Sequence, residues 1–209
     1  GEINPFKREI ASDMKDKLRF RFKRNAEWVG KEEDVFYITP SRSVKMDLWL
    51  EFLGWYVSEG CCPVSKKKPS KTLIDIRQCK LPNYEEIVNV VASLNLKYKR
   101  GKGRITVRDR DIRDILSPLG KAGDKYVPQY VKDLSPRQIK IFLDSLWKGD
   151  GCFQRGRYEN YTTKSPRLAD DVQELLLKID LVGTVGKRQY WNGIEQAYNT
   201  MYVVSPSHS

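Results

Sequence analysis

The sequence predicts a mixed α/β (α+β) fold made of two related halves that follow one another along the chain. Two apolar helices, each ending in an acidic residue and a glycine, open the halves about ninety residues apart. Each helix is followed by two strand-like segments, a second helix and two more strand-like segments. Basic residues are spread over both halves, with 38 Lys and Arg against 27 Asp and Glu and a formal net charge of +11. A basic surface of this kind attracts polyanions such as nucleic acids.

The chain divides into a basic segment at 1–42, a first repeat at 43–134 and a second repeat at 135–209. Strand-like alternation occurs in the basic segment at 18–22 and at 35–38. The whole chain is 209 residues long with 40% hydrophobic residues, which is enough to bury a substantial core.

The first repeat is expected to begin with a helix at 44–58, capped by the side chain of Ser43. This helix is apolar around most of its circumference, which is typical of a helix buried at the centre of a protein. The elements expected after it are a strand at 72–78, a helix at 82–94, two strands around the Gly101-Lys102-Gly103 turn, and a short helix at 111–116.

The second repeat follows the same order. Ser135 followed by Pro136 predicts the start of a helix that runs to Gly149. The elements expected after it are strands at 152–155 and 157–163, a helix at 166–179, and strands at 184–191 and 195–204.

The ends of the two apolar helices can be aligned, with residues 52–60 over residues 143–151. Each copy carries two small residues four positions apart, which is about one helical turn. Small residues on one face allow two helices to approach closely, so we expect these helices to pack side by side. The small residues are Gly54 and Ser58 in the first copy and Ser145 and Gly149 in the second.

Side-by-side packing would bring the two terminal acids, Glu59 and Asp150, together at one end of the helix pair. Adjacent carboxylates repel each other, and a hard divalent cation such as Mg²⁺ relieves that repulsion and bridges to a substrate phosphate. The following residues, Gly60 and Gly151, are expected to supply the unusual backbone angles needed where a helix turns into a strand. The alternative is that both acids are ordinary helix ends followed by glycine stops.

Other catalytic classes are poorly represented in the sequence. The single histidine, His208, argues against Ser-His-Asp or Cys-His catalysis. No apolar run approaches the ~20 residues that span a membrane, so no membrane partner is expected. The cysteines are interpreted as reduced packing residues, so an intracellular location is expected. The cysteines form no Cys-x-x-Cys pair, so we expect neither a structural zinc site nor a disulfide framework; they are Cys61, Cys62, Cys79 and Cys152.

The paired helix ends resemble the motif of LAGLIDADG homing endonucleases, and the match covers residues 43–204. Glu59 stands where the commoner residue is Asp, and Ser145 replaces the family's glycine. The resemblance implies a site-specific double-strand DNA endonuclease with Mg²⁺ or Mn²⁺ at Glu59 and Asp150. It also implies that the motif helices pack at the centre of the molecule and that two saddle-shaped sheets straddle the DNA.

Two further segments are similar to intein-encoded members of the family. Residues 161–169 resemble the segment after the second motif, and residues 120–128 resemble the intein-type segment Gly-Lys-x-x-x-Lys-x-Ile-Pro. The second lysine of that segment reaches the active site, which implies a catalytic role for Lys125, such as stabilising charge on the phosphate. A solvated surface lysine is the alternative. The second repeat offers only Lys187 as a weak counterpart.

Residues 19–40 are similar to the junction between the splicing and endonuclease parts of some inteins, which agrees with an origin in a larger intein. Gly1 is not a splicing nucleophile and the sequence does not end in His-Asn, so this stretch is not expected to splice by itself.

The expected partner is double-stranded DNA with a long, asymmetric target site, because two unequal repeats in one chain form a pseudo-symmetric monomer. About half of the side chains on each strand would face the DNA. The candidate DNA-binding residues are Lys66, Lys68, Lys71, Arg77, Lys102, Arg104 and Arg108 in the first repeat, and Arg155, Arg157, Lys187, Arg188 and Tyr190 in the second.

Two other functions remain open at this point. One is a nucleic-acid-binding protein of the same family that has lost cleavage, either an RNA maturase or a DNA-binding regulator. The other is a basic structural module that binds no nucleic acid, in which the repeated acid-glycine pattern would be coincidence.

Overall fold

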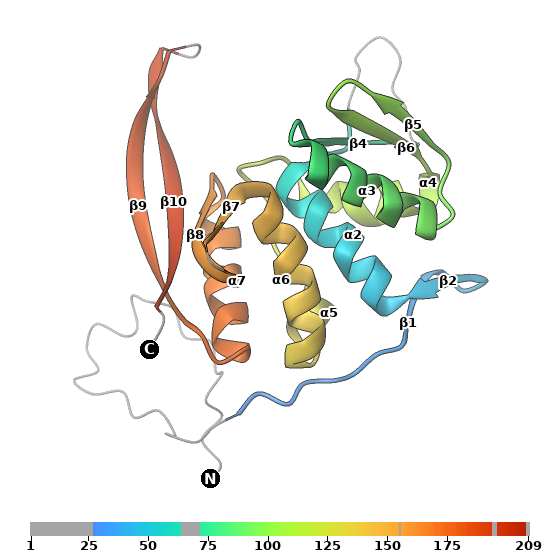
Figure 1. The fold of residues 1–209 in the computed structure, drawn as a ribbon, viewed down its shortest axis with the longest axis horizontal. Helices are drawn as coiled ribbons and strands as arrows, with labels where there is room; N and C mark the ends of the chain where they lie inside the picture. Colours follow the sequence, from blue (N-terminus) through green and yellow to red (C-terminus); the bar gives the residue numbers. More distant parts are fainter. Residues whose placement is uncertain (1–26, 64–71, 155, 194–195, 208–209) are drawn as a thin grey trace.

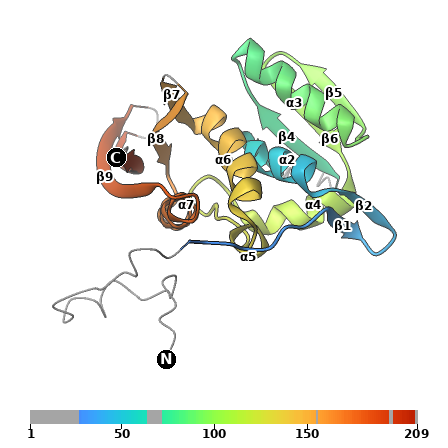
Figure 2. The same ribbon diagram turned by 60° about the horizontal axis from the view of Figure 1, so that its bottom comes forward.

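The computed structural model describes residues 27–63, 72–154, 156–193 and 196–207. Two four-stranded antiparallel sheets lie on either side of a central pair of helices, α2 and α6 (Figure 1). The view in Figure 2 shows the same arrangement, with the helix pair between the two sheets. The strand expected at 18–22 lies outside the described residues.

The first central helix is α2 (Met46–Glu59), and most of its side chains are buried, as its apolar circumference predicted. It follows a hairpin of β1 (Val35–Thr39) and β2 (Arg42–Lys45). The expected cap at Ser43 is wrong. Ser43 is a strand residue paired with Tyr37, and Lys45 occupies the capping position without a side-chain hydrogen bond.

The first sheet has the strand order β3-β4-β6-β5. One face carries the buried side chains of Ile74, Ile76, Ile105 and Val107, and the opposite face is more polar. Helix α3 packs on α2, and α4 follows β6. The bounds are β3 (Gly60–Cys61), β4 (Leu73–Arg77), α3 (Leu81–Ser93), β5 (Tyr98–Gly101), β6 (Arg104–Arg108) and α4 (Arg110–Leu116).

A connecting segment then crosses to the second half through a short 3₁₀ turn (Ser117–Leu119) and α5 (Gln129–Lys132). The second central helix, α6 (Pro136–Asp150), begins as predicted. The Ser135 hydroxyl accepts a hydrogen bond from the backbone N–H of Gln138, and Pro136 is the first helical residue.

The second sheet has the order β7-β8-β10-β9, which repeats the topology of the first sheet. The helix between its strand pairs, α7, packs against β9 and β10. The β9–β10 hairpin is longer than its counterpart in the first sheet and projects beyond the helices (Figure 1). The bounds are β7 (Gly151–Gln154), β8 (Arg157–Thr163), α7 (Pro166–Lys178), β9 (Val182–Asn192) and β10 (Ala197–Ser207).

Within the described ranges, none of the helices combines the length and the apolar character that crossing a membrane requires.

Candidate active site

The two central helices touch through their small residues. A Cβ atom added to Gly54 would lie 2.5 Å from the carbonyl oxygen of Phe142 and 2.8 Å from the Cβ of Ser145. A Cβ added to Gly149 would lie 2.6 Å from the Cβ of Ser58. Real Cβ atoms do not approach other heavy atoms so closely, so larger side chains at the two glycines would force the helices apart.

This packing brings the two acids together, because Glu59 is the last residue of α2 and Asp150 is the last residue of α6. Partial burial raises the pKa of Asp150 to about 7, and the nearby charge of Glu59 contributes to the same rise. Burial also raises the pKa of Glu59. Asp150 remains exposed to solvent, so the acid pair is accessible.

The glycines after the acids are required for space rather than for their backbone angles. Gly60 and Gly151 have φ values of −96° and −104°, which any residue can adopt, so the expected unusual angles are absent there. A Cβ on Gly60 would lie 2.6 Å from the carbonyl oxygen of Tyr56, and one on Gly151 would lie 2.6 Å from Cγ of Trp147. Glycine therefore lets each strand turn sharply over the last turn of its helix.

Gln78, which the sequence analysis did not select, contacts one of the two acids directly. Its side-chain amide donates a hydrogen bond to Oε1 of Glu59 at 3.0 Å. Its carbonyl oxygen accepts a hydrogen bond from the backbone N–H of Lys80 at 2.9 Å. Gln78 is buried, so this contact fixes the carboxylate of Glu59 in one orientation.

Lys80 is a second group that the sequence analysis missed. Its positive charge lowers the pKa of both Glu59 and Asp150, which opposes the effect of burial. Lys80 is exposed just before α3. The only sequence signals are that Gln78 ends the expected 72–78 strand and that Lys80 follows it by two residues, because the contacts with the acids arise from the fold.

Lys125 lies beside the same end of α2. It is only 3% exposed, and its Nζ donates a hydrogen bond to the carbonyl oxygen of Tyr56 at 3.1 Å and lies 3.7 Å from the centre of the Tyr56 ring. Burial lowers the pKa of Lys125 to about 8, and Cys62, Cys61 and Asp150 counteract part of this fall. The Ser165 hydroxyl donates to the backbone carbonyl of Lys125 at 2.6 Å. A solvated surface lysine at this position is therefore excluded.

The structure offers two carboxylates for a metal ion rather than a closed cage. Among the described residues no group of three or more His, Cys, Asp and Glu side chains converges on one point. Mg²⁺ is commonly held by one or two carboxylates, with waters and substrate phosphates completing its coordination. The acid pair fits such an ion, because a divalent cation would offset the repulsion that raises the pKa of Asp150.

The candidate DNA-binding residues of the first repeat fall into three groups. Arg77, Arg104 and Arg108 share the polar face of the first sheet, opposite its buried isoleucines. Lys102 lies in the turn between β5 and β6. Outside the described residues lie Lys66, Lys68 and Lys71, together with Arg155 of the second repeat.

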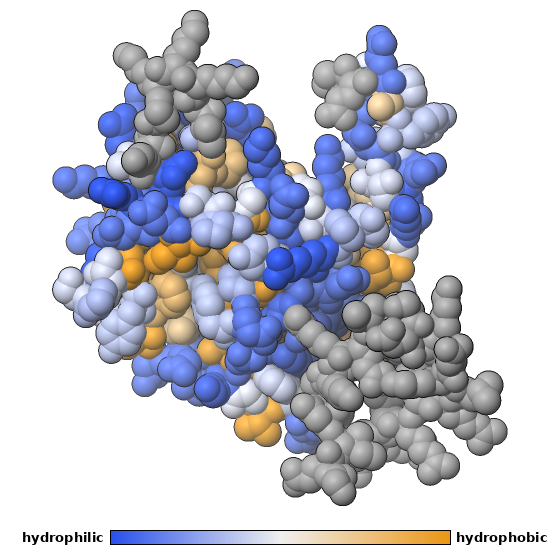
Figure 3. Space-filling view, turned by 180° about the vertical axis from the view of Figure 1, so that it is seen from behind, coloured by the Kyte–Doolittle hydropathy of each residue, from blue (hydrophilic) through white to orange (hydrophobic). Residues whose placement is uncertain are grey.

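In the second sheet, Arg188 and Tyr190 share one face of β9, and Lys187 points to the opposite face. That opposite face packs on α7 near Gly183. Arg157 is exposed on β8. Lys187 is on the edge strand, farthest in the sheet from β7, so the structure does not bring it to the acids. The space-filling view shows two arms rising on either side of a hollow, one of them formed by β9 and β10 (Figure 3).

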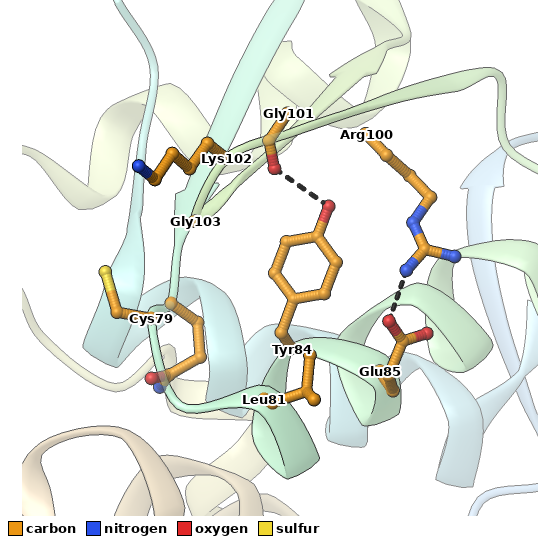
Figure 4. Close-up of a pocket in the computed structure, with 9 residues that line it drawn as sticks. Cys79, Leu81, Tyr84, Glu85, Arg100, Gly101, Lys102 and Gly103 are labelled. Carbon is orange, nitrogen blue, oxygen red and sulfur yellow. Dashed lines mark hydrogen bonds and ion pairs between the residues drawn. The ribbon is translucent and has the colours of Figure 1, made fainter.

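A surface pocket of about 680 Å³ lies next to the acid pair without containing it. Gln78 contributes to its wall, and the hydroxyl of Tyr84 donates to the carbonyl of Gly101 at 3.1 Å (Figure 4). The backbone N–H of Gln78 also donates to the carbonyl of Gly103 at 3.1 Å. The first bond holds the β5–β6 turn against α3, and the second holds it against the end of β4.

Comparison with known proteins agrees with the repeated architecture. A family model described as a LAGLIDADG-like domain matches residues 137–205. The fold is similar to that of I-DmoI, solved in complex with DNA and Ca, with a TM-score of 0.54. That likeness covers 78% of this chain and 83% of that chain, at 14% sequence identity, and it shows a shared fold.

Three curated proteins are similar in sequence to parts of this chain. Two of them are 26% identical and match 70% of this chain: the ATP-dependent Clp protease proteolytic subunit of Chlamydomonas moewusii and a DNA gyrase subunit of Mycobacterium kansasii. The replicative DNA helicase DnaB of Synechocystis is 39% identical over 70 residues. The matches span only 15%, 30% and 8% of these proteins, respectively.

Proposed function

We propose that the chain is a LAGLIDADG endonuclease that cuts both strands of DNA at a specific site, because residues 137–205 match the LAGLIDADG-like family model and the fold is similar to that of I-DmoI. The observation that carries the proposal is the meeting of Glu59 and Asp150 at the end of two helices joined by small residues. Carboxylates at such close quarters suit a divalent cation and a phosphate substrate.

Glu59 and Asp150 would hold Mg²⁺, or another divalent cation such as Mn²⁺. The bound cation would act as a Lewis acid at the scissile phosphate. Gln78 keeps the Glu59 carboxylate in place through its hydrogen bond. The described residues include no histidine. The carboxylates and lysines would therefore make the chain's own contribution to proton transfer.

Lys125 supplies a buried positive charge beside the last turn of α2. Its pKa of about 8 leaves it mostly protonated at neutral pH and close to the value at which it can exchange a proton. A protonated lysine here would stabilise the charge that develops on the phosphate during cleavage. Lys80 adds a second positive charge that acts on both acids.

The two sheets would hold the DNA on their polar faces, with the acid pair between them. Arg77, Arg104 and Arg108 supply positive charge to the face of the first sheet, and Arg157 and Arg188 supply it to the second. Phosphate contacts would give affinity and contacts with base edges would give specificity. Because the two faces differ in sequence, a single chain would recognise an asymmetric site.

An intein origin has separate support. The protease, the gyrase and the helicase have unrelated activities. In each of these three proteins, the part that matches this chain is a minor part of that protein's own length. A segment shared by proteins of such different activity is most simply an inserted element. We infer that this chain is the endonuclease part of an intein, with residues 1–42 leading from the splicing part.

The test is incubation of the protein and Mg²⁺ with a randomised double-stranded DNA library, followed by sequencing of the cut ends. We expect one long, asymmetric site cleaved on both strands, and no cut ends when EDTA is present. Selective retention of DNA without cleavage would identify a cleavage-inactive DNA-binding protein. Retention of RNA in preference to DNA would identify a maturase.

A further inference from the structure

A buried carboxylate lies on the polar face of the first sheet, outside the acid pair. Asp75, in the middle of β4, is only 2% exposed. It accepts a hydrogen bond from Nη2 of Arg104 at 2.7 Å and another from the hydroxyl of Thr106 at 2.8 Å. Both donors belong to the neighbouring strand β6, and Thr106 is the direct cross-strand partner of Asp75.

The strand register places Arg104 on this face beside another arginine. Arg77 and Arg104 are direct cross-strand partners, so two like charges face each other. Asp75 lies two residues before Arg77 on β4, and its carboxylate neutralises the charge of Arg104. Among the described residues, neither Arg77 nor Arg108 has a carboxylate within ion-pair distance, so Arg104 alone of the three is held in this way.

This difference separates two kinds of DNA contact. A phosphate contact depends on net positive charge and does not require a fixed side chain, so the exposed Arg77 and Arg108 are suited to it. Reading a base edge requires a guanidinium with a fixed direction, and its charge matters less. The side chain of Arg104 is 47% exposed, so its remaining N–H groups stay available to a ligand while Asp75 fixes its orientation.

The partner that matches an oriented guanidinium is guanine, which presents its O6 and N7 acceptors together in the major groove. Asp75 is too deeply buried to reach a base itself, so it acts on Arg104 alone. We propose that Arg104, oriented by Asp75, reads a guanine in the half of the target site bound by the first repeat. This inference rests on the proposed binding of double-stranded DNA.

The position of that guanine follows from the strand register. Arg104 begins β6 directly after the turn that is hydrogen-bonded to Gln78, and Gln78 contacts Glu59. Arg108 ends the same strand, about 13 Å farther along at roughly 3.3 Å per residue. The guanine read by Arg104 therefore lies nearer to the cleavage position than the contact made by Arg108.

The test is selection of bound sequences from a randomised double-stranded library without divalent metal, so that binding is measured apart from cleavage. Wild type, Arg104→Ala and Asp75→Asn are compared, with Arg108→Ala as the matched control on the same strand. Wild type is expected to select a G·C pair at one position. Arg104→Ala should reduce that preference by roughly 5- to 100-fold at that pair alone.

Asp75→Asn should weaken the same preference at the same base pair, because it frees the guanidinium without removing it. Arg108→Ala should leave that pair unchanged. Thermal melting of each variant distinguishes a folding defect from a loss of recognition. Arg104→Gln, at the same half-exposed position, is the second variant and is used if Arg104→Ala fails to fold.

The inference is overturned if Arg104→Ala weakens binding to all sequences equally and lowers the slope of log K against log salt by about one, since this is the behaviour of a phosphate contact. It is also overturned if the protein selects no DNA. Selective binding through Arg104 without any cleavage in Mg²⁺ would reject only the proposed endonuclease function.

Discussion

Gly54 of α2 lies against Ser145 of α6 with no room for a side chain between them, since an added Cβ would come within 2.8 Å of the Cβ of Ser145. The backbone carbonyl of Phe142 is nearer still, at 2.5 Å, and cannot move without disturbing α6. This contact fixes how closely the helices approach and therefore how closely Glu59 and Asp150 lie at their shared end.

Gly54→Leu should lower the free energy of unfolding by at least ~1–3 kcal/mol through overpacking of this interface. Urea unfolding measures the loss. Gly123→Ala is the matched control, because a Cβ at Gly123 meets nothing within 4 Å and should leave stability nearly unchanged. An unchanged urea midpoint for Gly54→Leu would show that the two helices tolerate a wider separation.

The acid pair makes stability depend on pH. Folding raises the pKa of Asp150 from 3.8 to about 7, so between these values the folded state binds more protons than the unfolded state. The free energy of unfolding of the metal-free protein should therefore fall as the pH rises from about 4 to about 7. Glu59 contributes in the same direction, because burial raises its pKa as well.

Asp150→Asn should flatten this fall, and addition of Mg²⁺ to wild type at pH 7 should raise the melting temperature. The measurement is chemical denaturation across the pH range in EDTA, for wild type and variant together. Parallel pH profiles in the two proteins would mean that Asp150 titrates normally and that its surroundings do not desolvate it.

Lys125→Met should slow single-turnover cleavage by orders of magnitude while DNA affinity changes little. Methionine fills most of the buried space and removes the charge that we assign to the phosphate. Lys121→Met is the control, because Lys121 is exposed in the preceding turn. Equal rates for wild type and Lys125→Met would remove Lys125 from the catalytic groups, although the two acids would keep their assignment.

Binding to DNA should weaken steeply with salt. The logarithm of the association constant is expected to fall by roughly 0.9 per neutralised phosphate against the logarithm of salt concentration. Filter binding or fluorescence anisotropy between low and moderate salt measures the slope. A flat response would mean that the basic sheet faces do not contact phosphates.

The repeated architecture was readable from the sequence because each part left a local signal. Helical periodicity and the proline starts marked α6 and α7, and the spacing of Gly54 and Ser58 marked a close helix contact. The same signals misplaced the start of α2. Residues 42–45 pair with β1, and this pairing outweighs the preference of Ser43 for a capping position.

The parts that sequence could not supply depend on contacts between distant segments. Gln78 reaches Glu59 only because β4 pairs with β3, which continues from α2. Likewise, Lys125 is buried because Tyr56 and Ser165, from opposite halves of the chain, both bind it. No local sequence pattern around Gln78 or Lys125 predicts these contacts. The sequence therefore indicated Lys125 only because residues 120–128 resemble a family segment.

The most direct test of the central claim is cleavage by Glu59→Gln and Asp150→Asn, measured in single turnover on the selected DNA site with Mg²⁺. Each substitution keeps the shape of the side chain and removes one carboxylate charge. Double-strand cleavage should be lost in both variants while each still binds the site with near wild-type affinity in the absence of metal. Full cleavage by both variants would contradict the assignment of Glu59 and Asp150 as the catalytic pair.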